Sequence, residues 1–289
     1  MKICFSRKGF DSQYGRIASP ILPDGRLVPL PIPAAHDDLT MKDIKLTSVD
    51  IDVDGLLHDL SGGRLSMETH IHLDPDLSRA SDQRLPGWRP ALGQTGAAHG
   101  HLARQKFGAG DVFLFFGWFR KVERVGGRWR YAASAPNLHV MFGWLEVAEV
   151  LPIVTQREDC LRRHPWIAAH PHVAKPDHYD SDLNNLYVAG TASRYVNRAS
   201  FGAGQFPYFK DALRLTAAGG SRTLWRLPGW FLPDSTRPPL SYHPAGSRWG
   251  HDDQGVLLRS AAKGQEFVLD ADHYPEAEPW LRNLLEEAI

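Results

Sequence analysis

Long apolar runs in the middle of the chain predict β-strands. They are rich in Phe, Val, Leu and Trp, residues that favour a pleated, half-buried surface. The strands predicted in this way are 2–5, 111–119, 138–150 and 185–189. The dipeptide Gly126-Gly127, followed by the alternating segment 128–131, predicts a hairpin turn. The pattern indicates a β meander or part of a small barrel.

Helical patterns lie outside this β-rich centre. The predicted helices are 97–107, a segment near 207–216 and an amphipathic segment 275–288. Pro- and Gly-rich connections, most of all within residues 6–33, predict segments that wrap a core. We therefore predict one α+β domain over residues 1–289, with a β core at about 67–151, peripheral helices and long loops.

Histidines are gathered in pairs separated by a single residue. The pairs are His70/His72, His99/His101 and His170/His172. With 14 histidines among 289 residues, random placement gives fewer than one such pair. Imidazole is a common metal ligand and exchanges protons near neutral pH. The pairs therefore indicate metal or proton chemistry.

The first pair lies in a segment, 67–74, that reads as a strand. The side chains that share one face of this segment, at alternate positions, are Glu68, His70, His72, Asp74 and Asp76. Two imidazoles and a carboxylate hold iron or zinc and leave positions open for water or substrate. We predict a divalent metal site made by His70, His72 and Asp74 or Asp76. A strand with a solvated polar face and acid/base chemistry without metal are the alternatives.

The other two pairs differ in their local geometry. His99 and His101 lie in a predicted helix, where side chains two residues apart diverge by about 200°. His170 precedes a proline, which biases it towards an extended conformation and brings His172 to the same face. A three-histidine centre is formed if one of these later histidines meets His70 and His72.

Composition narrows the class of protein. The formal net charge is zero and the hydrophobic fraction is 43%, so the chain has ample material for a core and no global attraction to nucleic acid. Cys4 and Cys160 are the two cysteines, too few for a disulfide framework or a Cys-rich zinc site. The first residues do not read as a signal peptide, and no apolar stretch reaches the about 18 residues of a membrane span. We expect a cytoplasmic protein.

Several side chains are candidates for substrate binding or proton transfer. Arg7 and Lys8 follow the first strand and are placed to neutralise a phosphate or carboxylate, with a solvated glycine turn as the alternative. The other substrate-binding candidates are Trp88, Arg128, Trp129, Arg130 and Gln265. They pair cations with aromatic rings, or offer an amide to a substrate edge. Glu266 and His172 are the candidates for proton transfer.

Several short sequence motifs along the chain resemble those of a known family. They are Phe5-Ser-Arg-Lys-Gly-Phe-Asp11, Ser19-Pro-Ile-Leu-Pro-Asp-Gly25, Leu30-Pro-Ile-Pro33, His72-Leu-Asp-Pro-Asp76, Gly110-Asp-Val-Phe-Leu-Phe-Phe-Gly117 and Gly264-Gln-Glu-Phe-Val-Leu-Asp270. The chain resembles the third type of nucleotide-modification-associated domain, a bacterial and phage family. The resemblance implies an association with nucleotide or DNA modification and assigns no catalytic residue. About 40 residues of the β centre also resemble PUA-like and EVE-type domains, which bind RNA or modified bases.

These observations lead to two functional hypotheses. The first is a metal-dependent oxygenase or hydrolase, with iron or zinc activating dioxygen or water on a nucleotide, a base in nucleic acid or a small polar metabolite. The second is a non-catalytic reader of modified nucleic acid, in which the histidines are surface or packing residues. A structural subunit that works with other modification-system proteins is a third possibility.

Overall fold

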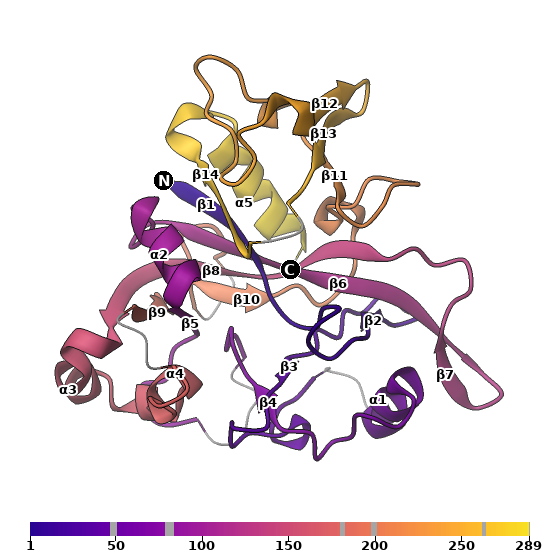
Figure 1. Cartoon of the computed structure of the whole chain (residues 1–289), viewed down its shortest axis with the longest axis vertical. Coiled ribbons are helices and arrows are strands. Elements are labelled where there is room, and N and C mark those ends of the chain that lie inside the picture. The colour runs from indigo at the N-terminus through magenta and orange to yellow at the C-terminus, as the bar shows by residue number, and fades with distance from the viewer. Residues whose placement is uncertain (47–50, 79–83, 180–182, 198–200, 262–263, 289) are drawn as a thin grey trace.

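The computed structural model describes residues 1–46, 51–78, 84–179, 183–197, 201–261 and 264–288 (Figure 1). The strands are β1 (Lys2–Arg7), β2 (Ser19–Ile21), β3 (Ile32–Pro33), β4 (Ile71–His72), β5 (Ala91–Thr95), β6 (Val112–Val125), β7 (Arg128–Tyr131), β8 (Leu138–Pro152), β9 (Asn184–Ala189), β10 (Ala203–Gln205), β11 (Leu224–Leu227), β12 (Trp249–Asp252), β13 (Gly255–Arg259) and β14 (Glu266–Asp270). The α-helices are α1 (Val53–Ser61), α2 (Gly96–Arg104), α3 (Ile153–Arg163), α4 (Pro171–Ala174) and α5 (Ala277–Ala288). Short 3-10 helices are η1 (Met41–Asp43), η2 (Pro165–Ala169), η3 (Asp211–Leu213), η4 (Gly229–Phe231), η5 (Gly246–Arg248) and η6 (Ala271–His273).

One large mixed sheet organises the molecule. Its main path runs β14-β1-β6-β8-β9-β5, with β2 and β7 paired to β6 and β10 paired to β8. The β1–β6 pair is parallel, and the other pairs along this path are antiparallel. In Figure 1, α5 and the small sheet β11-β13-β12 lie on one side of the large sheet, and β3, β4 and α1 lie on the other. The fold is α+β, as the sequence predicts.

The large sheet is curled, so that its two edges approach each other. Register shifts interrupt β6–β8 between Phe115 and Phe116 and β8–β9 between Val147 and Glu149, and bulges of this kind bend and twist strands. The edges do not pair through their backbones. Gln94 of β5 and Glu266 of β14 are instead joined by a side-chain hydrogen bond, and α2 packs against both strands. Within the described residues, the result is an open sheet, not a closed barrel.

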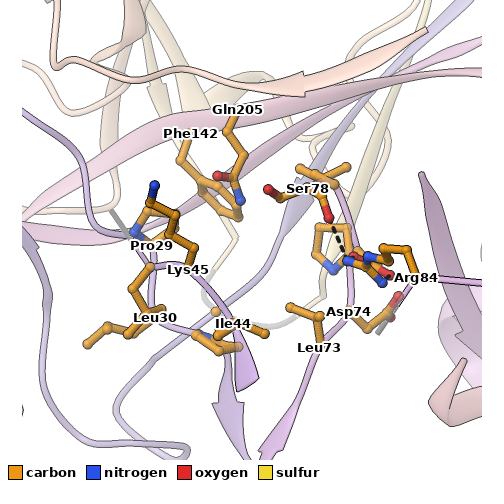
Figure 2. A pocket seen from close by; sticks show the side chains of 16 residues that line it. Pro29, Leu30, Ile44, Lys45, Leu73, Asp74, Ser78, Arg84, Phe142 and Gln205 are labelled. Atoms are coloured by element: carbon orange, nitrogen blue, oxygen red, sulfur yellow. Dashed lines mark hydrogen bonds and ion pairs between the residues drawn. The ribbon is translucent and has the colours of Figure 1, made fainter. Parts of the chain in front are cut away.

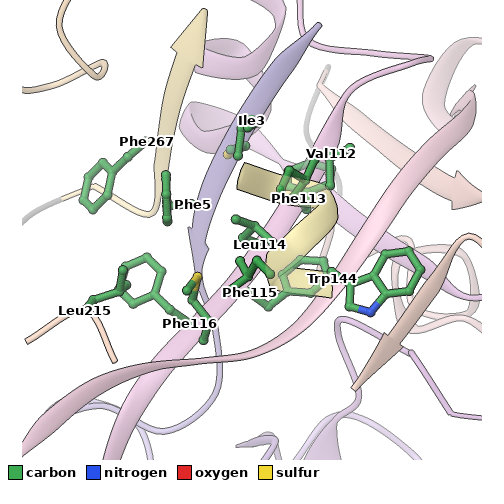
Figure 3. Packing of buried hydrophobic residues seen from close by; sticks show 14 of the residues in the cluster. Ile3, Phe5, Val112, Phe113, Leu114, Phe115, Phe116, Trp144, Leu215 and Phe267 are labelled. Carbon is green, nitrogen blue, oxygen red and sulfur yellow. The ribbon is translucent and has the colours of Figure 1, made fainter. Parts of the chain in front are cut away.

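Aromatic side chains fill the main core. On one side of the sheet, Phe5, Phe116 and Phe267 pack around Trp225, and each of the four is fully buried. Figure 3 shows Phe5, Phe116 and Phe267 in this core. Trp225 also donates a hydrogen bond from its indole nitrogen to Nδ1 of His139, which satisfies a polar group that would be costly to bury alone. The apolar runs of β1, β6 and β8 therefore form strands because both of their faces are covered.

Several elements differ from the sequence prediction. The helix predicted near 207–216 is wrong: this segment runs extended and bonds to residues 25–27, β8 and β11, apart from the single turn η3. The strand predicted at 67–74 is reduced to β4, because its partner β3 contains Pro33, which lacks the N–H that a ladder requires. The helices predicted at 97–107 and 275–288 are present with slightly different ends. Every helix in the described residues is too short or too polar to cross a bilayer.

Candidate metal centre

Strand β4 and the turn after it supply two polar side chains to the site. His72 is the last residue of β4, and Asp74 follows two residues later, before a cis peptide bond to Pro75. The Gly93 N–H of β5 donates a hydrogen bond of 2.7 Å to Asp74 Oδ1. Asp74 is thereby fixed between β4 and the edge strand of the large sheet, and its side chain is only 5% exposed.

The third His-x-His pair reaches the same place from the other end of the sequence. Pro171 begins α4, a position that suits its fixed φ, and His170 is the N-cap residue with an extended backbone. The extended conformation predicted for residues 170–172 is therefore correct for His170. It is wrong for His172, which lies in the first turn of α4. Helix α4 packs against β5 and β9, and this contact carries both histidines to Asp74.

Three imidazoles converge on the Asp74 carboxylate. Its Oδ2 lies 3.8 Å from Nε2 of His72 and 3.7 Å from Nε2 of His172, and its Oδ1 lies 3.6 Å from Nε2 of His170. His72, Asp74 and His172 each offer one ligand atom, and these three atoms lie within 4.8 Å of one another. A contraction of about 1 Å brings these atoms to the separations found around one ion with bonds of about 2.0–2.2 Å.

Hydrogen bonds to the other ring nitrogens decide which histidines can bind a metal. Nδ1 of His72 lies 2.7 Å from Asp37 Oδ2, and Nδ1 of His172 lies 3.0 Å from Asn184 Oδ1. Asn184 is oriented by its amide, which donates to the His172 carbonyl. Because both partners are acceptors, each Nδ1 carries the proton and each Nε2 offers a lone pair towards Asp74. Metal-bound histidines typically have this arrangement.

His170 has the opposite tautomer. Its Nδ1 accepts the His172 backbone N–H at 3.3 Å, so in the neutral ring the proton is on Nε2, facing Asp74 Oδ1. That nitrogen is buried and has no hydrogen-bond partner within the described residues. Gly93 thus holds one oxygen of Asp74, which His170 Nε2 approaches to 3.6 Å, and the other oxygen is left to His72 and His172.

The protonation states suit a cation. Burial lowers the pKa of His172 to about 4, so its ring is neutral at physiological pH. Burial of the Asp74 carboxyl opposes its ionisation, but the His170, His172 and His72 rings outweigh that effect and lower its pKa below the usual range. A buried carboxylate beside the neutral His172 ring suits metal binding, because these two groups need release no proton first.

This cluster opens into a cavity of about 390 Å³. His72, Asp74, His172 and Tyr179 line one part of its wall, and another part is formed by Arg7, Lys8, Gln94, Thr95 and Gln265. Tyr179 stacks on His172 with ring centroids 4.3 Å apart, and its hydroxyl lies 2.7 Å from Nδ1 of His72. Burial and the nearby carboxylates raise the Tyr179 pKa, so the phenol keeps its proton.

A second, mainly apolar pocket adjoins the other side of the Asp74 segment (Figure 2). Leu30, Ile44, Leu73 and Phe142 form much of its wall. The Arg84 guanidinium at its edge is already bound to the Asp76 carboxylate and the Ser78 carbonyl. Asp74 lines both cavities, whereas His72 and His172 line the first cavity and not the apolar pocket.

Two predicted ligands lie outside the cluster. His70 is an exposed residue whose Nδ1 contacts the Asp37 carbonyl at 2.7 Å. Asp76 forms a bidentate ion pair with Arg84 and accepts a hydrogen bond of 3.1 Å from the Trp88 indole. The alternation assumed for residues 67–74 requires a regular strand, and β4 is too short to provide it.

This placement predicts that Asp76→Asn leaves metal binding unchanged and lowers stability. Removing one charge from a buried ion pair leaves Arg84 uncompensated, at a cost of about 3–5 kcal/mol. Chemical denaturation and metal content, measured on the same preparation, test both parts. Loss of metal at unchanged stability would place Asp76 among the ligands after all.

The middle histidine pair serves helix packing. His99 contacts the Tyr187 hydroxyl at 3.2 Å, and His101 contacts Ser241 Oγ at 2.9 Å. The two rings leave α2 in different directions, as a helix requires. They connect α2 to β9 and to the segment beside β14, and do not join the Asp74 cluster.

The predicted aromatic and basic patches also lie apart from the cavity. Trp88 is 6% exposed and packs beneath Arg84. Trp129 packs against the α1 side of the molecule, and Arg130 pairs with Glu123 on the β6–β7 hairpin, which projects away from β4 and α4 in Figure 1. Arg128 is exposed on the same hairpin.

The remaining candidates are at or behind the cavity wall. Arg7 lines the cavity, packs over Phe116 and Phe267, and donates to the Ala261 carbonyl. Lys8 and Gln265 also line it. Glu266 is 1% exposed and lies behind Lys8, to which it is ion-paired at 3.1 Å. Its two oxygens are occupied by neighbours, which does not suit a general acid or base.

Sequence reasoning missed the residues that orient the histidines. Asp37, Tyr179 and Asn184 come from three separate segments, and no spacing relates them to a His-x-His pair. Gly93 and Gln94 belong to the short segment 91–95, which has no strong strand pattern. Tertiary contacts alone bring these five residues to the site.

The fold and the cluster define an α+β protein with a buried His/Asp group at one end of a polar cavity. The chain belongs to the nucleotide modification associated domain 3 family, whose model matches residues 2–270. The match confirms the family resemblance of the sequence and associates the chain with nucleotide modification. No curated protein and no solved structure matches the chain.

Proposed function

We propose that this protein is a metal-dependent enzyme that modifies a nucleotide or a base in nucleic acid, with iron or zinc held by His72, Asp74 and His172. The observation that carries the proposal is the fixed direction of the two Nε2 lone pairs towards one oxygen of Asp74. Two histidines and a carboxylate with open positions are typical of non-haem iron and of catalytic zinc.

The chain's own residues have distinct roles in this proposal. Asp37 and Asn184 hold the two histidine rings, and Gly93 holds Asp74. The metal supplies activation of water or dioxygen. The cavity volume is within the range of about 300–1,000 Å³ that suits a small ligand. A base in duplex nucleic acid would therefore have to leave the stack to enter.

The test is metal content by mass spectrometry on protein purified anaerobically without a histidine tag, followed by incubation with nucleotides and oligonucleotides. We expect near-stoichiometric iron or zinc and a product that is not formed in the presence of a chelator. A requirement for dioxygen would indicate an oxygenase, and product formation without it a hydrolase. Binding of a modified oligonucleotide that is unchanged and independent of metal would favour a reader instead.

A further inference from the structure

A buried polar network forms another part of the wall of the cavity that the Asp74 cluster lines. Glu266 Oε1 accepts hydrogen bonds from Gln94 Nε2 at 2.7 Å and from Lys8 Nζ at 3.1 Å. Cys4 Sγ donates to Oε2 at 3.3 Å. Glu266, Gln94 and Lys8 are 1%, 4% and 8% exposed, so the network is almost fully removed from bulk water. Gln94 and Lys8 line the cavity, and Glu266 lies behind them.

Glu266 fixes what this wall presents to a ligand. A carboxylate accepts hydrogen bonds and does not donate them, so the NH₂ end of the Gln94 amide faces Glu266 and its carbonyl oxygen is directed to the opposite side. Lys8 uses one of its three protons on Glu266 and retains two donors. The cavity wall therefore offers an acceptor beside donors, and the charge of Lys8 is balanced by Glu266.

We propose that Gln94 and Lys8, oriented by Glu266, bind the edge of a nucleobase within the cavity that His72, Asp74 and His172 also line. A nucleobase is a neutral ring with donors and acceptors side by side on its edge, and it complements the Gln94 acceptor and the Lys8 donors, whose charge Glu266 balances. Lys8 would attract a phosphate less strongly, because the negative charge of Glu266 offsets part of the Lys8 positive charge. This inference rests on the proposed function and adds the group by which the substrate is recognised.

The experiment measures binding to metal-free protein by isothermal titration calorimetry. The probes are thymidine, deoxycytidine, deoxyadenosine, deoxyguanosine and 2-deoxyribose 5-phosphate. We expect at least one nucleoside to bind, and Gln94→Leu to weaken that binding by about tenfold or more, because a buried partner is left unpaired. The matched control is Gln254→Leu, in the exposed turn between β12 and β13, which should bind as the wild type does.

Glu266→Gln tests the orientation without removing volume. The neutral amide no longer forces Gln94 to direct its oxygen into the cavity, and it leaves the Lys8 charge unbalanced. We expect nucleoside binding to weaken and 2-deoxyribose 5-phosphate binding to strengthen. A purely structural role for Glu266 would weaken both alike, which would overturn the proposal.

The outcomes separate this inference from the metal proposal. Nucleoside binding that depends on Gln94 in a protein that never contains metal would refute the metal centre and support base recognition. Stoichiometric metal without nucleoside binding, equal binding of sugar phosphate and nucleoside, or full binding by Gln94→Leu would overturn base recognition alone.

Discussion

Replacing His172 by alanine is expected to remove the metal from this protein. Loss of an outer hydrogen-bonding partner of a metal ligand alone reduces metal affinity by about 10–100-fold, so loss of the ligand itself should exceed about 100-fold. Activity should fall in proportion, because the ion activates the reacting molecule. The measurement is competition for iron or zinc between the apo protein and a chelator of known affinity, followed by turnover with added metal.

The informative companion is His70→Ala. The strand pattern of the sequence makes His70 a ligand, whereas the structure turns it to the surface against the Asp37 carbonyl. We expect His70→Ala to keep its metal. If His70→Ala lost the ion and His172→Ala retained it, the ligands would be those of a continuous strand over 67–74, and the cluster around Asp74 would be incorrect.

The contrast between His70 and His172 shows which parts of the candidate site can be predicted from the sequence. Alternation along 67–74 placed His72 and Asp74 on one face, and the structure also brings these two side chains together. The pattern depended on a regular strand, and Pro33 in β3 prevents one from extending. The frequency of His-x-His pairs drew attention to His170 and His172, which the structure places beside Asp74. Their approach to Asp74 depends on α4 packing against β5 and β9, which no local pattern encodes.

For the fold as well, local sequence patterns predicted some features, and tertiary contacts determined the others. Apolar runs located β1, β6, β8 and β9, because their composition reflects burial on both faces. Curling of the sheet, which brings Gln94 of one edge to Glu266 of the other, results from bulges and side-chain packing. Glu266 therefore looked like a candidate for proton transfer in the sequence, and its enclosed position is visible only in three dimensions.

Gly93→Ala is expected to damage the metal centre without altering any ligand. A Cβ built on Gly93 would lie 2.3 Å from Cδ2 and 2.4 Å from Cγ of the His172 ring, well inside van der Waals contact. The ring has little room to withdraw, because Tyr179 stacks on it at 4.3 Å. The φ angle of Gly93 is outside the left-handed region, so alanine adds no backbone strain and the effect is steric.

We expect Gly93→Ala to weaken metal binding by about 10–100-fold, as displaced supporting groups do, and to lower the free energy of unfolding by about 1–3 kcal/mol through overpacking. Gly246→Ala is the matched control, because a Cβ at Gly246 meets nothing within 4 Å. Chelator competition and urea denaturation of both variants provide the two quantities. Full metal affinity in Gly93→Ala, with the predicted loss of stability, would mean that the His172 ring can move without consequence for the ion, which is incompatible with His172 as a ligand. A parallel loss of both quantities, confined to Gly93→Ala, is the result that the packing of β5 against α4 requires.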